Sequence, residues 1–567
     1  MKNLEIARIF HSIAQILEIK GENIFRIRAY ERAAQIIDGI DNIEEYARRD
    51  SLTTISGIGV DLASKIKEYI ETGKVKHYEE LKKDIPVGIL ELLDIPSLGP
   101  KTVKLFYKEF NIKDIATLEK YAKEGRLLGL EGIKEKTVEN ILKGIALIKK
   151  GKERINIATA WEIANRFVGE LKVLKEIKQI AVAGSLRRMK ETVKDIDILV
   201  ISVKAKKVMD AFCSCRDVGE VIAKGITKSS VLSKDGIQVD MRVVEPVSFG
   251  AALMYFTGSK NHNIKLRTLA VKRNLKINEY GVFRGKKCLA SKTEKEIYDL
   301  LRMQYIEPEL REDNGEIEAA QKNKLPKLIE LKDIKGDFHV HTIYSDGSNS
   351  IEEIANTCKE MGYEYVALTD HSRSLRVAHG LSVTDLKRKK KEIEKINKKI
   401  KNFVILYGTE VEIDSQGNID YNNDVLGEFD FVVAAIHSGF KQSKEQLTRR
   451  IVKACQNLHV DAIAHLTGRL WGTRDSYDLN FDEVFKVAKD TNTFLEINAF
   501  PNRLDLGDTH IRIAKEKGIK FVIATDAHAL EHLDYMKFGV AMACRGWLQK
   551  QDVLNTLSLK QILRIKK

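Results

Sequence analysis

Seven short apolar runs in the C-terminal half constrain the fold of this chain more than any other feature. They alternate with stretches of helical periodicity, the pattern of a largely parallel sheet whose strands are joined by helices. The runs are GDFHVH, YEYVALTDH, FVILYGTEVEI, FDFVVAAIH, VDAIAH, FLEINA and FVIATDAH. Six of them carry His, Asp or Glu near their C-terminal end, and parallel strands bring those ends to one edge. We therefore expect a barrel-like domain with a polar cluster at that edge.

The polar residues at the strand ends have the composition of a metal site. H-x-H and D-x-H place both side chains of each pair on one face of a strand. Histidine and carboxylate ligands without cysteine suit Mn²⁺, Zn²⁺ or Fe better than a structural zinc site. The set is large enough for two or three ions, which could polarise a phosphoryl group and generate hydroxide. Its members are His339, His341, Asp370, His371, Glu410, His437, His465, Asp526 and His528.

The charge of the chain is uneven. Residues 1–315 hold 57 Lys and Arg against 45 Asp and Glu, a net charge of +12, whereas residues 316–567 have a net charge of +2. The first half is therefore expected to bind a polyanion, although a solvated, lysine-rich surface would have the same charge. Six cysteines in 567 residues do not form a disulfide framework, and no apolar run reaches the ~20 residues of a membrane span. We expect a cytoplasmic protein with no membrane segment.

Three segments within the first ~150 residues are similar to one another. Residues 55–70, 95–110 and 130–145 each place a short glycine-bearing turn before an amphipathic helix. Glycine permits a tight turn, and the free N–H groups of the following helix can bind phosphate. The segments resemble helix-hairpin-helix motifs, which hold the DNA backbone without reading its sequence; the third lacks the second glycine. Repetition in a basic region favours DNA binding over three ordinary helical hairpins.

A second group of candidate residues lies between 181 and 244. Asp195 and Asp197 occupy one strand and point to the same face, where two carboxylates repel each other unless a divalent metal neutralises them. Asp240 lies in another β-rich run, and three aspartates can hold two Mg²⁺ (or Mn²⁺) ions. A D-x-D pair alone would be a solvated strand edge. The preceding Gly184-Ser185 turn and the Arg187-Arg188 pair, which can bind phosphate, favour the metal interpretation.

The segment GSLRRMKETVKDIDILV resembles the nucleotidyltransferase signature of family X DNA polymerases, the family of polymerase beta. YFTGSKNHN (255–263) resembles the nucleotide-pocket motif of this family, and residues 277–283 and 293–312 resemble its thumb. The resemblance covers residues 1–315. It implies that Asp195, Asp197 and Asp240 hold the two catalytic metals, with Asp240 nearest the primer 3′-hydroxyl. The implied nucleotide pocket consists of Gly184, Ser185, Arg187, Arg188, Arg242, Tyr255, Phe256, Gly258 and Asn263.

The N-terminal segment looks like the small domain of the same family that binds the 5′-phosphate of a gap. Lys65 matches the Schiff-base nucleophile of members with deoxyribose-phosphate lyase activity. Asp61, one helical turn earlier, opposes that role because it would pair with the amine and repel phosphate. Lyase activity and a surface lysine therefore both stay open. The DNA-binding residues that the resemblance and the hairpins imply are Arg26, Tyr30, Gly57, Gly59 and Gly99.

The C-terminal half resembles the polymerase-and-histidinol-phosphatase (PHP) domain. HVHTIYSDG, ALTDHS, GTEVEI, AIHSG, AHLTGR and ATDAH carry the resemblance, which covers about residues 335–567. The metal ligands that it implies are His339, His341, Asp346, His371, Glu410, His437, His465, Asp526 and His528. His379, His459, His510 and His532 fall outside the pattern, and we expect structural or surface roles for them.

We therefore expect a multidomain protein with six segments. Helix-hairpin-helix regions form a gap-binding domain (1–80) and a DNA-binding subdomain (81–150). An α+β nucleotidyltransferase palm (151–246) and a nucleotide-pocket and thumb-like region (247–315) follow. A polar connection (316–334) leads to a (β/α)7 barrel-like PHP domain (335–567).

The joint architecture looks like that of prokaryotic family X polymerases with a C-terminal PHP domain. It implies DNA-directed synthesis across short gaps in base-excision repair and a PHP 3′→5′ exonuclease, an activity that can extend to cutting at abasic sites or cleaning of 3′ ends. The implied partners are gapped or primed DNA and dNTPs, bound by a nucleoid-associated monomer. Three alternatives stay open: a PHP domain that acts on small phosphoesters or pyrophosphate, a template-independent nucleotidyltransferase, and a non-catalytic DNA-binding scaffold.

Overall fold

The computed structural model of the chain describes residues 2–38, 43–55, 57–84, 88–92, 95, 98–130, 132–151, 154–471 and 473–565. The chain divides into two compact units. The first unit comprises Met1–Arg154, Leu232–Gln238 and Lys260–Asn274, and the second comprises Ile155–Val231, Val239–Ser259 and Leu275–Lys567. Most of the palm, most of the thumb-like region and the C-terminal barrel belong to the second unit, and one boundary between the units falls at Arg154.

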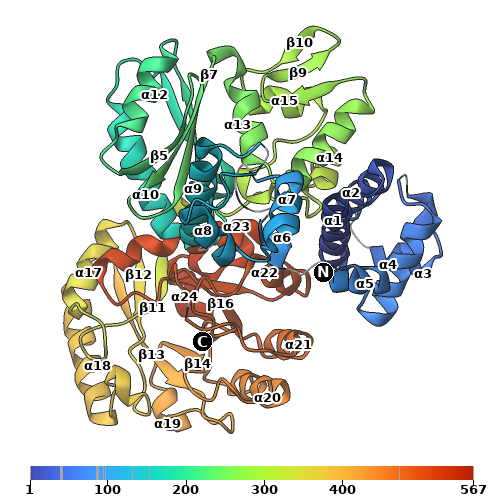
Figure 1. Cartoon of the computed structure of the whole chain (residues 1–567). Helices are drawn as coiled ribbons and strands as arrows, with labels where there is room; N and C mark the ends of the chain where they lie inside the picture. The colour runs from blue at the N-terminus through green and yellow to red at the C-terminus, as the bar shows by residue number, and fades with distance from the viewer. Residues whose placement is uncertain are drawn as a thin grey trace. The chain divides into compact units, whose positions relative to one another are not determined.

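The described part of residues 1–154 is helical, as its periodicity predicts (Figure 1). Buried side chains of its helices form one continuous apolar core that includes Phe10, Ile66, Phe106 and Ile141. The helices are α1 (Lys2–Lys20), α2 (Ile24–Asp38), α3 (Ile43–Arg48), α4 (Val60–Thr72), α5 (Lys76–Asp84), α6 (Gly88–Leu92), α7 (Pro100–Phe110), α8 (Ile115–Lys123) and α9 (Glu135–Gly151), with a 3-10 turn at Leu52–Thr54.

The three repeated segments form the same turn before α4, α7 and α9. In each, the N–H of the second apolar residue donates to the carbonyl of the first, three residues earlier. Gly57 and Gly132 have φ values of +97° and +79°, in the left-handed region that favours glycine. The third segment therefore forms the turn although it lacks one glycine. The donor-to-acceptor distances are 3.0 Å for Ile58 to Ile55, 3.0 Å for Leu98 to Ile95 and 3.1 Å for Ile133 to Leu130.

The palm is a five-stranded sheet in the order β2-β4-β7-β6-β5. Strand β4, between β2 and β7, is buried from Ile198 onward, whereas its first residue, Asp195, is exposed. The apolar run thus anchors the strand and leaves the acidic end accessible. The strands are β2 (Gln179–Val182), β4 (Asp195–Ile201), β5 (Val218–Lys224), β6 (Lys228–Ser233) and β7 (Gln238–Val244); β1 (Ile155–Asn156) pairs with β3 (Thr192–Val193), and the helices are α10 (Ile157–Lys172), α11 (Gly184–Arg187) and α12 (Ala205–Cys213).

The segment after the palm carries a small antiparallel sheet and the polar connection. The connection is packed: the N–H of Ile329 donates to the carbonyl of Leu548, and the Cys544 thiol lies 3.1 Å from the Ile329 carbonyl. It is therefore part of the second unit. The elements here are α13 (Phe249–Thr257), α14 (Lys260–Val271), β8 (Lys276–Asn278), β9 (Gly281–Arg284), β10 (Lys287–Ala290), α15 (Glu294–Leu300) and α16 (Glu316–Gln321).

The C-terminal half is a seven-stranded parallel sheet in simple sequential order from β11 to β17. The Val340–Ala527 bridge and the hydrogen bond from the His341 N–H to the Ala527 carbonyl (2.8 Å) bring the two edge strands together. The structure confirms the expected barrel-like fold, and the barrel is nearly closed. The strands are β11 (Gly336–Val340), β12 (Tyr365–Leu368), β13 (Val404–Glu412), β14 (Phe431–Ala435), β15 (Ala462–Ile463), β16 (Phe494–Asn498) and β17 (Phe521–Ala524).

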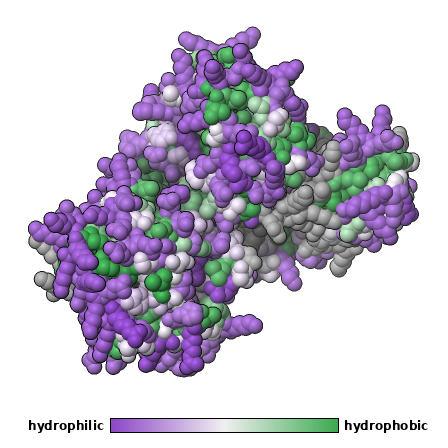
Figure 2. Space-filling model, turned by 90° about the vertical axis from the view of Figure 1, so that its left-hand side faces the viewer, coloured by the Kyte–Doolittle hydropathy of each residue, from purple (hydrophilic) through white to green (hydrophobic). Residues whose placement is uncertain are grey.

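Helices follow most of these strands and surround the sheet (Figure 1). They are α17 (Ile351–Glu360), α18 (Val383–Asn397), α19 (Asn423–Leu426), α20 (Lys444–Cys455), α21 (Phe481–Thr491), α22 (Asp508–Glu516), α23 (Met536–Arg545) and α24 (Leu559–Ile565). The face drawn in Figure 2 is mostly hydrophilic, with hydrophobic residues in scattered patches. In the part of the chain that the structure describes, no helix has the length and apolar character needed to cross a membrane.

Candidate functional sites

Glu410 is the centre of a buried cluster at the C-terminal ends of the barrel strands. It lies on β13 and is 1% exposed. Each of its carboxylate oxygens faces histidines that come from other strand ends. Oε1 lies 3.0 Å from His465 Nε2 and 3.3 Å from His437 Nε2, and Oε2 lies 2.8 Å from His371 Nδ1, 3.4 Å from His339 Nε2 and 3.6 Å from His341 Nε2.

Two further carboxylates complete the cluster. Asp526 Oδ1 lies 3.6 Å from His339 Nε2 and 3.3 Å from His341 Nε2. Asp346 faces His341, His371 and His528 at 3.7, 3.6 and 3.4 Å. The structure thus brings together all nine ligands that the PHP resemblance implies. Donor atoms of eight of them form three overlapping groups that could each hold an ion: His339, His341 and Asp526; His341, Asp346, His371 and His528; and His371, Glu410 and His437. His465 contacts Glu410 outside these groups.

The residues present fit bound metal ions. Among the described residues, four buried atoms of the cluster make no hydrogen bond of acceptable angle, although His371 Nδ1 lies 2.8 Å from one of them, Glu410 Oε2; the other three are His339 Nε2 and both ring nitrogens of His341. Buried polar atoms without partners are costly unless another group, such as a cation, satisfies them. Imidazole and carboxylate donors suit Mn²⁺, Zn²⁺ or Fe. Three adjacent donor groups agree with the expectation of two or three ions.

Carboxylates outside the cluster orient two of its histidines. Glu496 Oε1 lies 2.7 Å from His339 Nδ1, and Glu412 Oε2 lies 2.7 Å from His437 Nδ1. Such a contact fixes the ring and directs the opposite nitrogen, Nε2, toward the metal position. The sequence interpretation missed both glutamates. The signal that could have found them is an acidic residue within an apolar strand, as in FLEINA and GTEVEI.

The surroundings of two cluster histidines shift their pKa values in opposite directions. Burial, together with the nearby His528 and His371, lowers the pKa of His341 to about 3. For His371, burial acts in the same direction, but Glu410 and Asp346 outweigh it and raise its pKa to about 10. In the absence of metal, His371 thus holds a proton that a metal ion must displace. Metal binding should weaken as the pH falls.

Asp370, also expected at the metal edge from its position at a strand end, has another role. Its carboxylate lies 2.8 Å from Lys389 Nζ, and both side chains are fully buried. The Ser345 hydroxyl and the Thr342 N–H donate to Asp370 Oδ1 at 2.7 and 2.8 Å. Asp370 therefore fixes the loop after β11 and lies outside the three metal groups of the described residues.

Two of the histidines outside the pattern have the structural roles expected of them. The ring of His510 stacks on Phe481 at 4.0 Å. The Nδ1 atom of His532 accepts a hydrogen bond from the His528 N–H at 3.2 Å, which supports the backbone of a cluster residue.

In the palm, Gly184 and Asp197 are in close contact. Gly184 has a φ of +64°, and a Cβ atom there would lie 2.3 Å from Asp197 Oδ2. Burial, together with the nearby Asp195 and Asp240, raises the pKa of Asp197 to about 7. The Lys228 amine lies 3.3 Å from Asp240 Oδ2 and offsets part of this negative charge. The three predicted aspartates thus share one electrostatic environment, and two divalent ions would relieve their repulsion.

Carboxylates hold both predicted phosphate-binding arginines. Arg187 makes a bidentate pair with Glu294, at 2.8 and 2.7 Å. Arg188 Nε donates to Glu312 at 2.9 Å, and its Nη1 donates to the Thr257 carbonyl at 2.7 Å. The arginines that flank the Gly-Ser turn are therefore positioned by distant parts of the chain. A triphosphate that uses either guanidinium must share it with, or take it from, a carboxylate.

The remaining residues of the predicted nucleotide pocket lie on or beside α11, α13, α14 and β7. The Arg242 guanidinium lies 4.5 Å from the centre of the Phe256 ring, which contacts Tyr255 edge to face at 5.2 Å. Gly258 ends α13, and Ser185 lies on α11. Asn263 lies on α14, which belongs to the first unit, and its carbonyl accepts a hydrogen bond from Arg267.

Lys65 lies on α4 and pairs with Asp61 at 2.5 Å, the contact that the sequence predicts. Its side chain is 15% exposed, so Lys65 is less accessible than a free surface lysine. Burial raises the pKa of Tyr30, whose ring stacks on His77 at 6.2 Å. Arg26 pairs weakly with Glu22, at 3.5 Å. Of the predicted DNA-binding glycines, Gly59 and Gly99 directly precede α4 and α7, and Gly57 forms the first hairpin turn.

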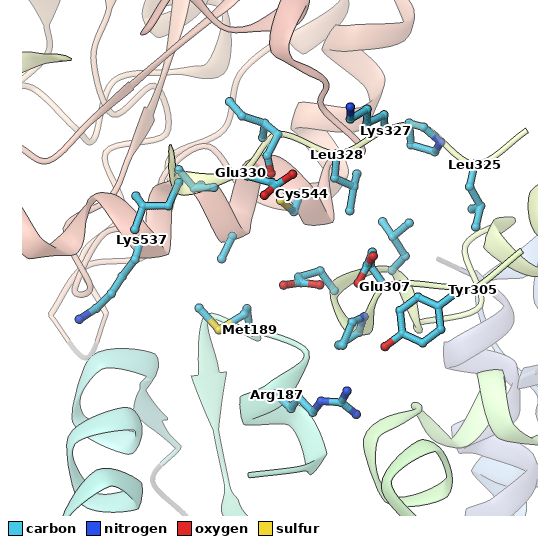
Figure 3. Close-up of a pocket in the computed structure, with 18 of the residues that line it drawn as sticks. Arg187, Met189, Tyr305, Glu307, Leu325, Lys327, Leu328, Glu330, Lys537 and Cys544 are labelled. Carbon is cyan, nitrogen blue, oxygen red and sulfur yellow. Dashed lines mark hydrogen bonds between the residues drawn. The ribbon is translucent and has the colours of Figure 1, made fainter. Parts of the chain in front are cut away.

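A pocket of about 780 Å³ lies next to the Gly184–Arg187 helix within the second unit. In Figure 3, Arg187 and Met189 line it from the palm, Leu325, Lys327 and Leu328 from the connection, and Lys537 and Cys544 from α23. The Tyr305 hydroxyl, also in the lining, donates to Glu294, the partner of Arg187. The lining contains three basic and three acidic side chains, so its net charge does not select a ligand.

The fold and the sites define a protein with two phosphoryl-transfer centres, an aspartate triad in a palm and a His/Asp/Glu cluster in a parallel barrel. Comparisons with known families agree. Residues 1–75 match a helix-hairpin-helix domain, and residues 89–146 match a SAM-like helix-hairpin-helix tandem. Residues 252–312 match the DNA polymerase beta thumb, and residues 337–500 match the PHP domain.

Curated relatives extend this result to the whole chain. The chain is 40% identical over 566 residues to "DNA polymerase/3'-5' exonuclease PolX" of Bacillus subtilis (strain 168), a match that covers 99% of each protein. It is 29% identical over 245 residues to "Probable phosphatase Teth514_1060" of Thermoanaerobacter sp. (strain X514), covering 41% of this chain and 95% of that protein. The chain belongs to the family X DNA polymerases that carry a C-terminal PHP domain.

Proposed function

We propose that this protein is a DNA-directed DNA polymerase that fills short gaps in base-excision repair, and a metal-dependent 3′→5′ exonuclease. The observation that carries the proposal is the presence of two complete sets of metal-binding side chains on separate sheets. The aspartate triad lies on β4 and β7 of the palm, and the nine-residue cluster lies at the edge of the barrel. The full-length relative whose name combines both activities supports the pairing.

In the polymerase site, the aspartates would hold two Mg²⁺ or Mn²⁺ ions, which would activate the primer hydroxyl and stabilise the leaving pyrophosphate. Asp240 would lie nearest the primer 3′-hydroxyl. Gly184 lets the backbone approach Asp197, so that its N–H and the Ser185 hydroxyl can bind the incoming triphosphate. Arg188 would add positive charge after leaving Glu312. Tyr255 and Phe256 would pack against the sugar, Asn263 would contact the base or the minor groove, and Arg242 is held against Phe256.

In the barrel site, the nine ligands would hold two or three Mn²⁺, Zn²⁺ or Fe ions, which would polarise the terminal phosphodiester and supply hydroxide. Glu410 faces five histidines and would be shared between ions. Glu496 and Glu412 keep His339 and His437 in the ligating orientation. The ligand side chains are mostly buried, but those of Asp346 and His528 are 31% and 30% exposed.

The three hairpins would bind the DNA backbone through the free N–H groups at the starts of α4, α7 and α9. Their region is also part of the basic half of the chain. The substrates would be gapped or primed DNA and dNTPs. A monomer in the prokaryotic cytoplasm, bound to the nucleoid, fits this activity. Cutting at abasic sites or removal of blocked 3′ ends would use the same barrel cluster.

A second candidate function for the barrel is hydrolysis of small phosphoesters. The match of residues in this half to proteins named probable phosphatases favours it, since it covers nearly all of one of them. One assay separates the two candidates. A 5′-labelled gapped duplex is incubated with Mn²⁺, with and without dNTPs. Extension with dNTPs and stepwise shortening without them support the proposal, whereas intact DNA combined with cleavage of p-nitrophenyl phosphate supports the alternative.

A further inference from the structure

The loop after β16 places one arginine directly beside the metal cluster. Arg503 Nε lies 3.3 Å from Asp526 Oδ2, on a side chain that is 16% exposed. The other oxygen of Asp526 faces His339 and His341. The Arg503 guanidinium is therefore separated from the first metal group by a single carboxylate. Neither the sequence motifs nor the comparisons assign a role to this residue.

One nitrogen of Arg503 is left without a partner. Among the described residues, Arg503 Nη1 is buried and donates no hydrogen bond. A desolvated N–H of a charged group that lacks an acceptor costs free energy, so a native site with this arrangement usually binds a ligand there. The natural ligand of a guanidinium fork is a phosphate or carboxylate oxygen.

Arg503 is not needed to orient the Asp526 carboxylate. The Asn498 amide already donates to the same oxygen, Asp526 Oδ2, at 3.1 Å. Asn498 is fully buried and also contacts Glu496, so it holds Asp526 in place as a neutral partner. The positive charge of Arg503 is thus available for another function.

The backbone of Arg503 is fixed, which directs its side chain toward the cluster. Arg469 donates to the carbonyls of Arg503 and Leu504, at 2.8 and 2.6 Å from Nη2. The Arg503 N–H donates to the Phe500 carbonyl at 2.8 Å. A neighbouring arginine on the same face, Arg474, is used differently: its Nε donates to the Gly468 carbonyl, and its guanidinium lies 3.8 Å from the centre of the Phe440 ring.

We propose that Arg503 binds a non-bridging phosphate oxygen of the phosphodiester that the metal cluster cleaves. This inference rests on the proposed nuclease function and identifies the substrate contact of that site. The guanidinium would hold the phosphodiester against the ions with Nη1, while Nε stays on Asp526. It would bind the substrate through charge and a fork geometry that lysine cannot reproduce.

The test uses the full-length, Mn²⁺-loaded protein and inorganic phosphate as the probe. The variants are Arg503→Gln, Arg503→Lys and the control Arg474→Gln, which removes the same charge from the same face. Manganese content is measured by mass spectrometry, phosphate affinity by calorimetry, and trimming of labelled single-stranded DNA by gel. Phosphate binding that is lost in His339→Ala is assigned to the cluster.

Arg503→Gln should retain its manganese, bind phosphate roughly 10- to 100-fold more weakly and trim DNA more slowly by a similar factor. Arg503→Lys should fall between this variant and the wild type, and Arg474→Gln should bind phosphate like the wild type. Unchanged phosphate affinity in Arg503→Gln, an equal loss in Arg474→Gln, or loss of manganese from Arg503→Gln would each overturn the inference. A wild type that binds phosphate at the cluster but leaves DNA intact would instead refute the proposed nuclease.

Discussion

Replacing Asp197 by Asn should stabilise the metal-free protein at pH 8. Asp197 is buried beside Asp195 and Asp240, and burial is the largest cause that raises its pKa from 3.8 to about 7. A carboxyl whose pKa is raised in the folded state contributes stability below its unfolded pKa and loses that contribution as the pH rises through the folded pKa. The stability contribution of the Asp197 carboxyl is therefore lost between about pH 4 and about pH 8.

The size of the effect follows from the shift. About three pKa units correspond to roughly 4 kcal/mol at pH 8, as an upper limit, and to about 2 kcal/mol at pH 5. Asparagine has nearly the same shape and no charge, so Asp197→Asn should avoid this cost. Its melting temperature in EDTA should exceed that of the wild type by several degrees at pH 8, and by about half as much at pH 5.

Differential scanning calorimetry at the two pH values is the assay. Asp210→Asn is the control, because Asp210 is exposed and the hydrogen bond from Lys224 lowers its pKa, so its replacement should give no stabilisation. Added Mg²⁺ should reduce the advantage of Asp197→Asn, since the ions neutralise the wild-type carboxylates. An equal melting temperature at pH 8, or the same increase at both pH values, would refute the electrostatic account of the triad.

Three other outcomes are expected. Gly184→Ala should reduce primer extension at least tenfold and leave trimming intact. The reason is that a Cβ atom there would collide with Asp197 and that the positive φ disfavours alanine. Normal extension would contradict the close approach of Gly184 to Asp197. Affinity for gapped DNA, measured by fluorescence anisotropy, should fall steeply between 50 and 200 mM salt, and flat binding would contradict phosphate contacts by the hairpins. Lys65→Ala should leave extension on an open template-primer largely unchanged, since Lys65 pairs with Asp61 outside the palm, and a large loss would indicate a structural role.

Most of the metal cluster could be predicted from the sequence, because side chains alternate along a strand and paired ligands therefore share one face. The H-x-H pair places His339 and His341 on one face of β11, and both rings approach Asp526 in the structure. Asp370 shows the limit of that argument, because a residue at a strand end can also be held by a buried lysine.

Long-range pairing could not be predicted from local spacing. The partners of Arg187 and Arg188, Glu294 and Glu312, lie more than 100 residues away in the chain. The sequence predicts a connection at 316–334 from its polar composition, and such a composition indicates only that the segment contains side chains that favour solvent. A few contacts, such as that of Ile329 with Leu548, are enough to pack such a segment.

The central claim is that two separate chemistries reside in one chain. The most direct test measures how three purified variants extend and trim one 5′-labelled gapped duplex. Asp195→Ala should lose most synthesis and keep trimming. His339→Ala and Asp526→Ala should lose trimming and keep synthesis, with longer products because these are no longer shortened. Each variant is first shown to melt cooperatively. Trimming that persists in His339→Ala and Asp526→Ala but disappears in Asp195→Ala would place hydrolysis in the palm and contradict the account.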